Sequence, residues 1–161
     1  MKKSIPYTRI IWKGMNRIFV IDTVALINYY NIFFHEKDML SPNVRNAISK
    51  CLDRSYDYFK LIIPSVVFVE IYKNFLRSEE MARKFYYEIF IQLKECEDVE
   101  IKPIEQEIVS LLLDVDSERT LELHDKIIYA SAVQMECTLI TNDPKIIKAN
   151  KRDKFIPEIL F

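Results

Sequence analysis

Short apolar runs alternate with longer segments of helical periodicity along this chain of 161 residues, and no other feature restricts its fold as strongly. Runs such as RIFVI at 17–21 and TLI at 138–140 are typical of strands buried on both faces. Repeated strand–helix units predict an α/β fold, a three-layer α/β/α sandwich with a central, mostly parallel sheet. We expect strands at 17–21, 61–63, 99–102 and 138–140, with the tail 155–160 as a candidate edge strand.

Helices are expected between these strands. Ser41 followed by Pro42 is typical of a helix start, because serine caps free backbone N–H groups and proline fits the first helical position. The apolar spacing predicts helices over 23–34, 41–58, 65–76, 78–95, 104–115 and 121–136, and a short one from Pro144.

The first residues of the chain carry positive charge only. Residues 1–17 include five lysines or arginines and no acid, and neither a linker nor a repeat divides the rest. We therefore expect a basic N-terminal extension at 1–16 and a single domain at 17–161. Whether 7–12 is a strand, a hairpin arm or part of that extension stays open.

Composition excludes several enzyme classes. Because Gly14 is the only glycine, the chain has no glycine-rich phosphate loop of the Rossmann, P-loop or kinase type and no G-x-S-x-G nucleophile elbow. The two histidines, His35 and His124, lie too far apart in sequence for an H-E-x-x-H zinc motif. These absences remove most nucleotide-fold enzymes and zinc hydrolases.

The cysteine pattern and the hydropathy indicate a cytoplasmic protein. The three cysteines are odd in number and form no C-x-x-C pair, which is typical of reduced thiols. The chain has no apolar run of about 18 residues and no signal peptide. We expect a soluble, cytoplasmic protein without a membrane partner.

Carboxylates follow two of the predicted strands directly. Asp22 comes after the first strand and Asp143 after TLITN, so both are expected at the carboxyl edge of the sheet, where ligands bind in open parallel folds. Each could instead cap the helix that follows it. Taken singly, neither acid distinguishes a site from a cap.

Asp125 lies near the start of the helix predicted over 121–136. That helix descends by about 17 Å from Asp125 to Glu136, and the following strand climbs back by roughly 17–20 Å. Asp125 and Asp143 should therefore end level with each other, at the same edge as Asp22. Capping does not explain Asp125, because Thr120 is the better cap candidate.

Glu70 lies in the second turn of a helix and is the fourth acid of the group. Helical side chains lean toward the N-terminus, so Glu70 can reach back toward the strand ends. Its alternative is a surface salt bridge with Lys73, the only near cation at helical spacing. Four converging acids would repel one another unless a cation lay among them, and oxygen ligands without His or Cys select Mg²⁺ or Mn²⁺. Such a site points to metal-dependent hydrolysis of phosphodiesters.

Three segments carry a resemblance to a known family. FVIDTVALI, IIPSVVFVEI and HDKIIYASAVQMECTLITNDPKI resemble the PIN-domain ribonucleases, and among them the VapC-type toxins of toxin–antitoxin pairs, over residues 17–161. The resemblance implies that domain 17–161 is a PIN-like nuclease domain. By position, the family's acidic metal-binding quartet and its two supporting hydroxyl residues match Asp22, Glu70, Asp125 and Asp143, with Thr23 and Thr141.

This resemblance implies Mg²⁺- or Mn²⁺-dependent endonucleolytic cleavage of RNA, frequent homodimers and, in toxin members, an antitoxin partner. The basic extension and the long helices predicted over 41–58 and 78–95 differ from the smallest toxins. We hypothesise that Asp22, Asp125 and Asp143 hold one divalent ion, and that Glu70 completes its ligands or positions a second ion or the attacking water.

Basic and aromatic residues near the acids in sequence are candidates for holding RNA. Tyr29 and Tyr30 are candidates for stacking on bases, although core tyrosines are the simpler interpretation. Solvated side chains are likewise the alternative for the basic candidates, which are Arg17, Lys73, Lys126, Lys145 and Lys148.

Two rival functions remain to be weighed. Aspartyl-phosphate chemistry at Asp22 is disfavoured, because Val24 replaces the second acid of a D-x-D motif and no adjacent acid pair is present. A non-catalytic PIN-like module that binds RNA or a protein is the alternative from outside enzymology.

Overall fold

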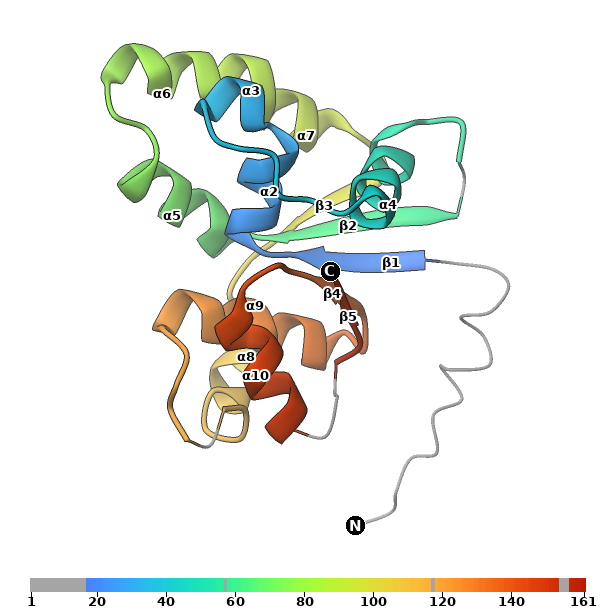
Figure 1. Cartoon of the computed structure of the whole chain (residues 1–161), viewed down its shortest axis with the longest axis vertical. Coiled ribbons are helices and arrows are strands. Elements are labelled where there is room, and N and C mark those ends of the chain that lie inside the picture. Colours follow the sequence, from blue (N-terminus) through green and yellow to red (C-terminus); the bar gives the residue numbers. More distant parts are fainter. Residues whose placement is uncertain (1–16, 57, 117, 154–156) are drawn as a thin grey trace.

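The computed structural model describes residues 17–161 except 57, 117 and 154–156. Its centre is a five-stranded parallel sheet in the order β3-β2-β1-β4-β5, which confirms the predicted α/β class (Figure 1). The expected extension at 1–16, with the open segment 7–12, lies outside the described residues. The strands are β1 (Arg17–Ile21), β2 (Phe59–Pro64), β3 (Val99–Lys102), β4 (Thr138–Ile140) and β5 (Ile159–Leu160).

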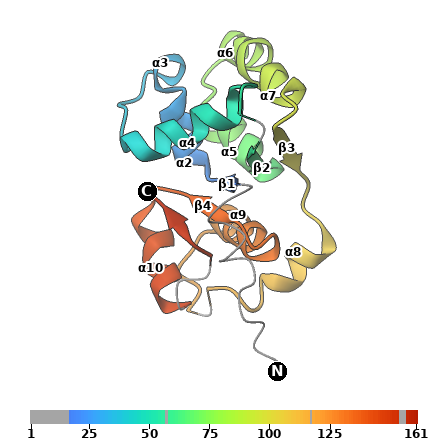
Figure 2. The same ribbon diagram turned by 90° about the vertical axis from the view of Figure 1, so that its right-hand side faces the viewer.

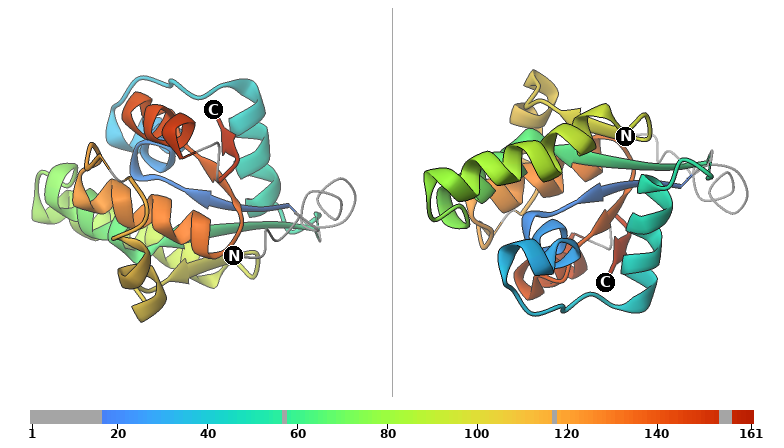
Figure 3. Two further views of the ribbon diagram at one scale, coloured as in Figure 1. Left: turned by 90° about the horizontal axis from the view of Figure 1, so that it is seen from below. Right: turned by 90° about the horizontal axis from the view of Figure 1, so that it is seen from above.

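Helices flank this sheet. Seen along the sheet, α2, α4 and α10 lie on one side and α9 on the other (Figure 3). In the views of Figures 1 and 2, helices α2 through α7 lie above β1, and helices α8 through α10 lie below it. The helices are α2 (Thr23–Tyr29), α3 (Asn31–Phe34), α4 (Pro42–Leu52), α5 (Ser65–Asn74), α6 (Glu79–Phe85), the π-helical turn η1 (Tyr86–Phe90), α7 (Ile91–Glu95), α8 (Gln106–Leu111), α9 (Leu123–Gln134) and α10 (Pro144–Arg152).

The apolar runs form the core as predicted. Val20, Ile21, Leu61, Leu139 and Ile140 on the central strands are completely buried. Strands β1, β3 and β4 have the predicted bounds, while β2 extends beyond 61–63 at both ends. Of the predicted tail strand 155–160, β5 covers 159–160, residues 157–158 are not in a strand, and 155–156 lie outside the described residues. Because apolar side chains face both layers, these strands could be located from local sequence alone.

Several predicted helix bounds are wrong. The helix expected over 41–58 starts after the Ser41 cap but ends at Leu52, because Asp53 is extended and the residues beyond it bury no apolar side chain before β2. The helix expected over 23–34 is interrupted at Tyr30 and ends at His35, which has a left-handed φ of 56°. Of the helix expected over 104–115, only α8 is present, and Leu113, beyond the end of α8, is 84% exposed.

The helix predicted over 78–95 is present as α6, η1 and α7 in succession. Ser78 caps it by accepting a hydrogen bond from the Met81 N–H, and Phe85, Ile89 and Leu93 are buried on one face. The π-helical turn changes the hydrogen bonding but leaves this face intact.

Thr120 does not cap α9, so that prediction is wrong. Glu122 precedes the helix without a capping side-chain bond, and the Thr120 hydroxyl donates to Asp116 Oδ1 at 2.8 Å. Asp116 also accepts from the Leu121 N–H at 2.8 Å and has a left-handed φ of 49°. The loop before α9 is therefore organised around a buried aspartate.

Among the described residues, no helix is long and apolar enough to cross a membrane.

Candidate active site

The chain adds strands β2 and β3 on one side of β1 and strands β4 and β5 on the other, so the strand order reverses between β1 and β4. A crevice is expected outside the carboxyl ends of the strands at such a switch point. Asp22 directly follows β1, and Thr141 directly follows β4. The Asp22 N–H donates to the Ile140 carbonyl at 3.1 Å, and the Thr141 hydroxyl donates to the Asp22 carboxylate. The two strand ends are thereby joined across the switch point.

Asp22 is a buried carboxylate at the centre of this edge. It is 2% exposed and caps α2 by accepting a hydrogen bond from the Ala25 N–H at 2.7 Å. Burial raises the pKa of Asp22 to about 7, against the hydrogen bonds from Thr141 and Ala25, and the charges of Asp125 and Asp143 raise it further. Asp22 is thus a helix cap and a member of a repulsive acidic cluster at the same time.

Asp125 lies in the first turn of α9 and belongs to the same cluster. Burial raises its pKa to about 6; the charge of His124 works against this shift, and those of Asp143 and Glu70 add to it. Asp143 caps α10 through the Lys145 N–H at 2.8 Å and donates its own N–H to the Thr141 hydroxyl at 3.0 Å. Asp125 therefore interacts electrostatically with each of the other three predicted acids, and Asp22 also interacts with Asp143.

Glu70 on α5 is paired with a residue that the sequence pattern did not single out. His124 Nε2 lies 2.9 Å from Glu70 Oε1 and 3.5 Å from Asp125 Oδ1, whereas the Lys73 side chain is exposed to solvent. The second Glu70 oxygen, Oε2, is buried and has no hydrogen-bond partner among the described residues. The available signal for His124 was its place directly before Asp125.

The donor set fits a hard divalent cation in its chemistry. Four carboxylates supply the oxygen ligands that Mg²⁺ and Mn²⁺ prefer, and the unpartnered Glu70 Oε2 is a buried acceptor without a donor. Among the described residues, no three Asp, Glu, His or Cys side chains already stand in a geometry that could hold an ion. Glu70 and Asp125 would have to exchange their contacts with His124 for contacts to the ion.

The supporting residues and the basic candidates are placed differently. Thr23 is buried, and its hydroxyl has no hydrogen-bond partner in the part of the chain that the structure describes. Lys145 Nζ lies 3.8 Å from Glu122 Oε1 near the acids, and Lys148 is exposed one turn further along α10. Lys126 lies on α9 directly after Asp125.

Arg17 does not join the acids. It begins β1, at the opposite edge of the sheet, where its guanidinium lies 5.8 Å from the centre of the Phe59 ring beside a hollow of about 540 Å³. The two tyrosines are largely structural: the Tyr29 hydroxyl is 3.1 Å from Ser49 Oγ, and burial raises the pKa of Tyr30. Closeness in sequence to Asp22 was misleading because a strand of five residues separates its two ends by about 16 Å.

The chain is thus a parallel α/β sandwich with acidic residues directly beyond the ends of β1 and β4. The PIN domain family matches residues 19–152, so the chain belongs to the PIN-domain family. PIN domains are typically nucleases. No curated protein matches the chain closely enough in sequence to count as a relative.

Solved structures show the same fold. VapBC2 from Rickettsia felis, bound to a DNA fragment from their promoter, is similar with a TM-score of 0.60 and 19% identity over 89% of this chain and 99% of that one. FitAcB from Neisseria gonorrhoeae is similar with a TM-score of 0.57 and 13% identity, over 83% and 93% of the two chains. A toxin–antitoxin complex from Klebsiella pneumoniae has a TM-score of 0.53 and 19% identity, over 88% and 95%. At these identities the likeness concerns the fold.

Proposed function

We propose that this protein is a metal-dependent endoribonuclease that hydrolyses RNA phosphodiester bonds. The observation that carries the proposal is the convergence of Asp22, Glu70, Asp125 and Asp143, where burial and mutual repulsion raise the pKa values of Asp22 and Asp125. Such a cluster is stabilised by a divalent cation. Membership of the PIN-domain family supports the same activity.

The four carboxylates would hold Mg²⁺ or Mn²⁺, which when bound neutralises phosphate charge and makes water a better nucleophile. The chain's own residues prepare this site. Thr141 and the Ala25 N–H fix the two oxygens of Asp22, so the carboxylate cannot rotate. We assign Thr23, whose hydroxyl is unpartnered, a supporting contact to a carboxylate or to water.

RNA is the proposed substrate, held through its phosphates. Lys73 follows Glu70 by one helical turn, and Lys145 and Lys148 follow Asp143 on α10. Lys126, next to Asp125 on α9, stays a candidate, whereas Arg17 is left out because it lies at the opposite end of β1 from Asp22. Lysines around an acidic centre would hold the flanking phosphates while the acids hold the metal.

We further propose that the protein acts in the cytoplasm as the toxin of a toxin–antitoxin pair, with an antitoxin as partner and a homodimer as its assembly. The support is the similarity in fold to VapBC2 and to a toxin–antitoxin complex. A non-catalytic PIN-like RNA- or protein-binding module is the second candidate. The observation in its favour is His124, which holds Glu70 and lies near Asp125 where a metal ligand set would have to close.

Cleavage of a mixed single-stranded RNA tests the proposal. We expect the purified protein to cut this RNA with Mn²⁺ and not with EDTA, and Asp22→Asn and Asp125→Asn to lose cutting while remaining folded. Asp114→Asn is the matched control, because Asp114 is an exposed acid outside the cluster. Equal cleavage by all variants, or no cleavage by the wild type with any divalent ion, would favour the binding module.

A further inference from the structure

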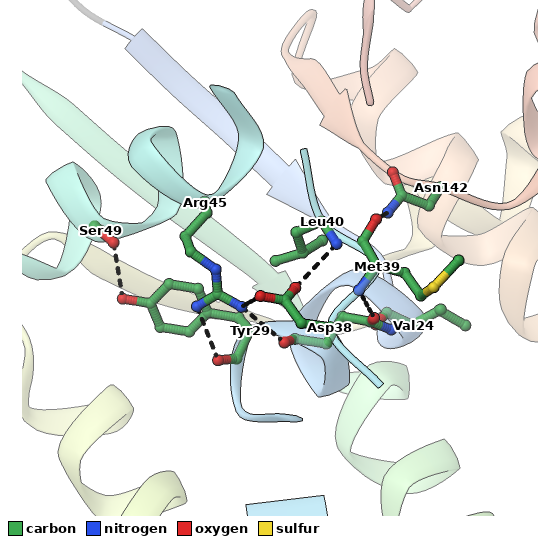
Figure 4. A network of polar contacts seen from close by, with 9 residues as sticks. Val24, Tyr29, Asp38, Met39, Leu40, Arg45, Ser49 and Asn142 are labelled. Carbon is green, nitrogen blue, oxygen red and sulfur yellow. Dashed lines mark hydrogen bonds and ion pairs between the residues drawn. The ribbon is translucent and has the colours of Figure 1, made fainter. Parts of the chain in front are cut away.

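The backbone of Met39 is held at both of its polar atoms by asparagine side chains from two different parts of the fold. The Met39 N–H donates to Asn28 Oδ1 at 2.8 Å, and the Met39 carbonyl accepts from Asn142 Nδ2 at 3.0 Å (Figure 4). The Asn28 amide in turn donates to the Val24 carbonyl at 2.9 Å. Met39 is therefore fixed between α2 and the loop after β4.

Met39 belongs to a connection between α3 and α4, residues 36–41, which we call the strap. The strap is also tied at Asp38, whose carboxylate lies 2.8 Å from Arg45 and accepts from the Leu40 N–H at 3.1 Å (Figure 4). Arg45 also donates to the carbonyls of Asn28 and Tyr29 at 3.1 and 3.4 Å. Three consecutive residues of an exposed loop are thus held in place.

The position of the strap relates it to the acidic cluster. Asn142 stands between Thr141 and Asp143, and Asn28 lies on the helix that Asp22 caps. The strap consequently links α2, which follows β1, to the loop that follows β4. Its hydrogen bonds to the two asparagines make it continuous with the proposed active site.

The side chain of Met39 is not used to stabilise the fold. It is 61% exposed, although its backbone is among the best held in the loop. Val24, two residues after Asp22, is 41% exposed. The Asn28 side chain joins the Val24 carbonyl to the Met39 N–H. Burial would explain an apolar residue held in this way, whereas exposure leaves the Met39 thioether, on its fixed backbone, and the Val24 side chain as an apolar ledge near the acids.

We propose that Met39 and Val24 form a subsite for an unpaired nucleobase of RNA next to the scissile phosphate, with Asn28 and Asn142 as its positioning residues. This inference rests on the proposed ribonuclease function and deepens it. A polarisable thioether adapts to any base face, and single-stranded RNA exposes bases that proteins hold through such contacts. A base-paired strand keeps its faces stacked, so the subsite favours single strands.

Binding of a fluorescein-labelled single-stranded RNA, measured by anisotropy in Ca²⁺ with intact RNA verified on a gel, tests the subsite without needing cleavage. We expect Met39→Ala to weaken binding by roughly twofold to tenfold, the order of one lost sulfur–aromatic contact, and to weaken binding of the matching duplex much less. Ile32→Ala, an 86% exposed apolar residue on α3, is the control and should bind like the wild type.

The positioning role is tested by hydrogen exchange and calorimetry. Asn142→Ala should speed exchange of the strap amides and weaken single-strand binding, while Met39→Ala should leave both strap exchange and Mn²⁺ affinity unchanged. A normally folded Met39→Ala protein that binds single strands like the wild type overturns the subsite, as does equal loss for single strand and duplex. A wild-type protein that binds no RNA also overturns it and favours a protein partner on this ledge.

The two proposals fail separately in this design. Selective loss of single-strand binding in Met39→Ala, together with no cleavage by the wild type in Mn²⁺, keeps the subsite and rejects the nuclease. Cleavage with wild-type RNA binding in Met39→Ala keeps the nuclease and rejects the subsite.

Discussion

Replacing Asp22 with asparagine gives a quantitative test of the electrostatics of the acidic cluster. Burial raises the pKa of Asp22 from 3.8 to about 7 in the folded protein. The unfolded chain therefore ionises first, and the folded state loses stability as the pH rises from about 4 to about 7. Above that window the loss is complete. The asparagine of the variant does not titrate, so the variant does not lose this stability as the pH rises.

The size of the effect follows from the shift. Each pKa unit corresponds to about 1.4 kcal/mol, so the wild type loses about 2 kcal/mol between about pH 5.5 and about pH 8 that Asp22→Asn keeps. The stronger hydrogen bonding of the charged carboxylate is already included in the pKa of Asp22, and any cost of the substitution that does not depend on pH cancels in the comparison. The difference in unfolding free energy should therefore change by about 2 kcal/mol in favour of the variant.

Urea unfolding followed by far-ultraviolet circular dichroism, with EDTA present, measures this difference at the two pH values. Asp114→Asn, at an exposed position, is the control and should track the wild type. A difference between Asp22→Asn and wild type that stays constant within about 0.5 kcal/mol would refute the reasoning, because the carboxyl would then titrate as it does in the unfolded chain. Addition of Mn²⁺ at about pH 8 should stabilise the wild type and not Asp22→Asn.

Three further substitutions probe single contacts by the same unfolding assay. Thr141→Val removes the hydroxyl that donates to Asp22 and should cost about 1–3 kcal/mol, most at high pH, where the carboxylate is charged; an unchanged stability would mean that this bond does not form. Asp116→Asn replaces the acceptor of the Leu121 N–H with an amide and should cost about 1–3 kcal/mol at neutral pH, and less in acid, because hydrogen bonds outweigh burial and lower the pKa of Asp116. Ser78→Ala removes a helix cap and should cost about 1 kcal/mol, and a loss below about 0.3 kcal/mol would contradict the cap.

Sequence alone predicts the sheet well because its strands depend on local features. The segments β1, β3 and β4 are short apolar runs, and parallel strands are buried on both faces. Helix ends were harder to predict, since they depend on contacts elsewhere. Nothing local shows that the helix from Pro42 stops at Leu52, or that Asp116 rather than Thr120 organises the approach to α9.

The acidic cluster could be proposed in advance, because topology brings Asp22 and Asp143 to one edge of the sheet and helix geometry points Glu70 and Asp125 toward it. Their partners could not. The contact of His124 with Glu70 joins α9 to α5, and the grip on Met39 joins α2 to the loop after β4. Both sets of contacts depend on side-chain positions that the whole fold determines. The sequence offers only indirect signals for them: His124 stands next to an acid, and Asn28 is an isolated polar residue in an apolar run.

Location of Mn²⁺ by anomalous diffraction from crystals soaked in manganese tests the central claim most directly. The account predicts a peak among the carboxylates of Asp22, Glu70, Asp125 and Asp143, with Glu70 withdrawn from His124. The peak should be absent in Asp125→Asn crystals treated identically. A manganese ion bound elsewhere in the wild type, or no peak at this edge of the sheet, would contradict the proposed metal centre.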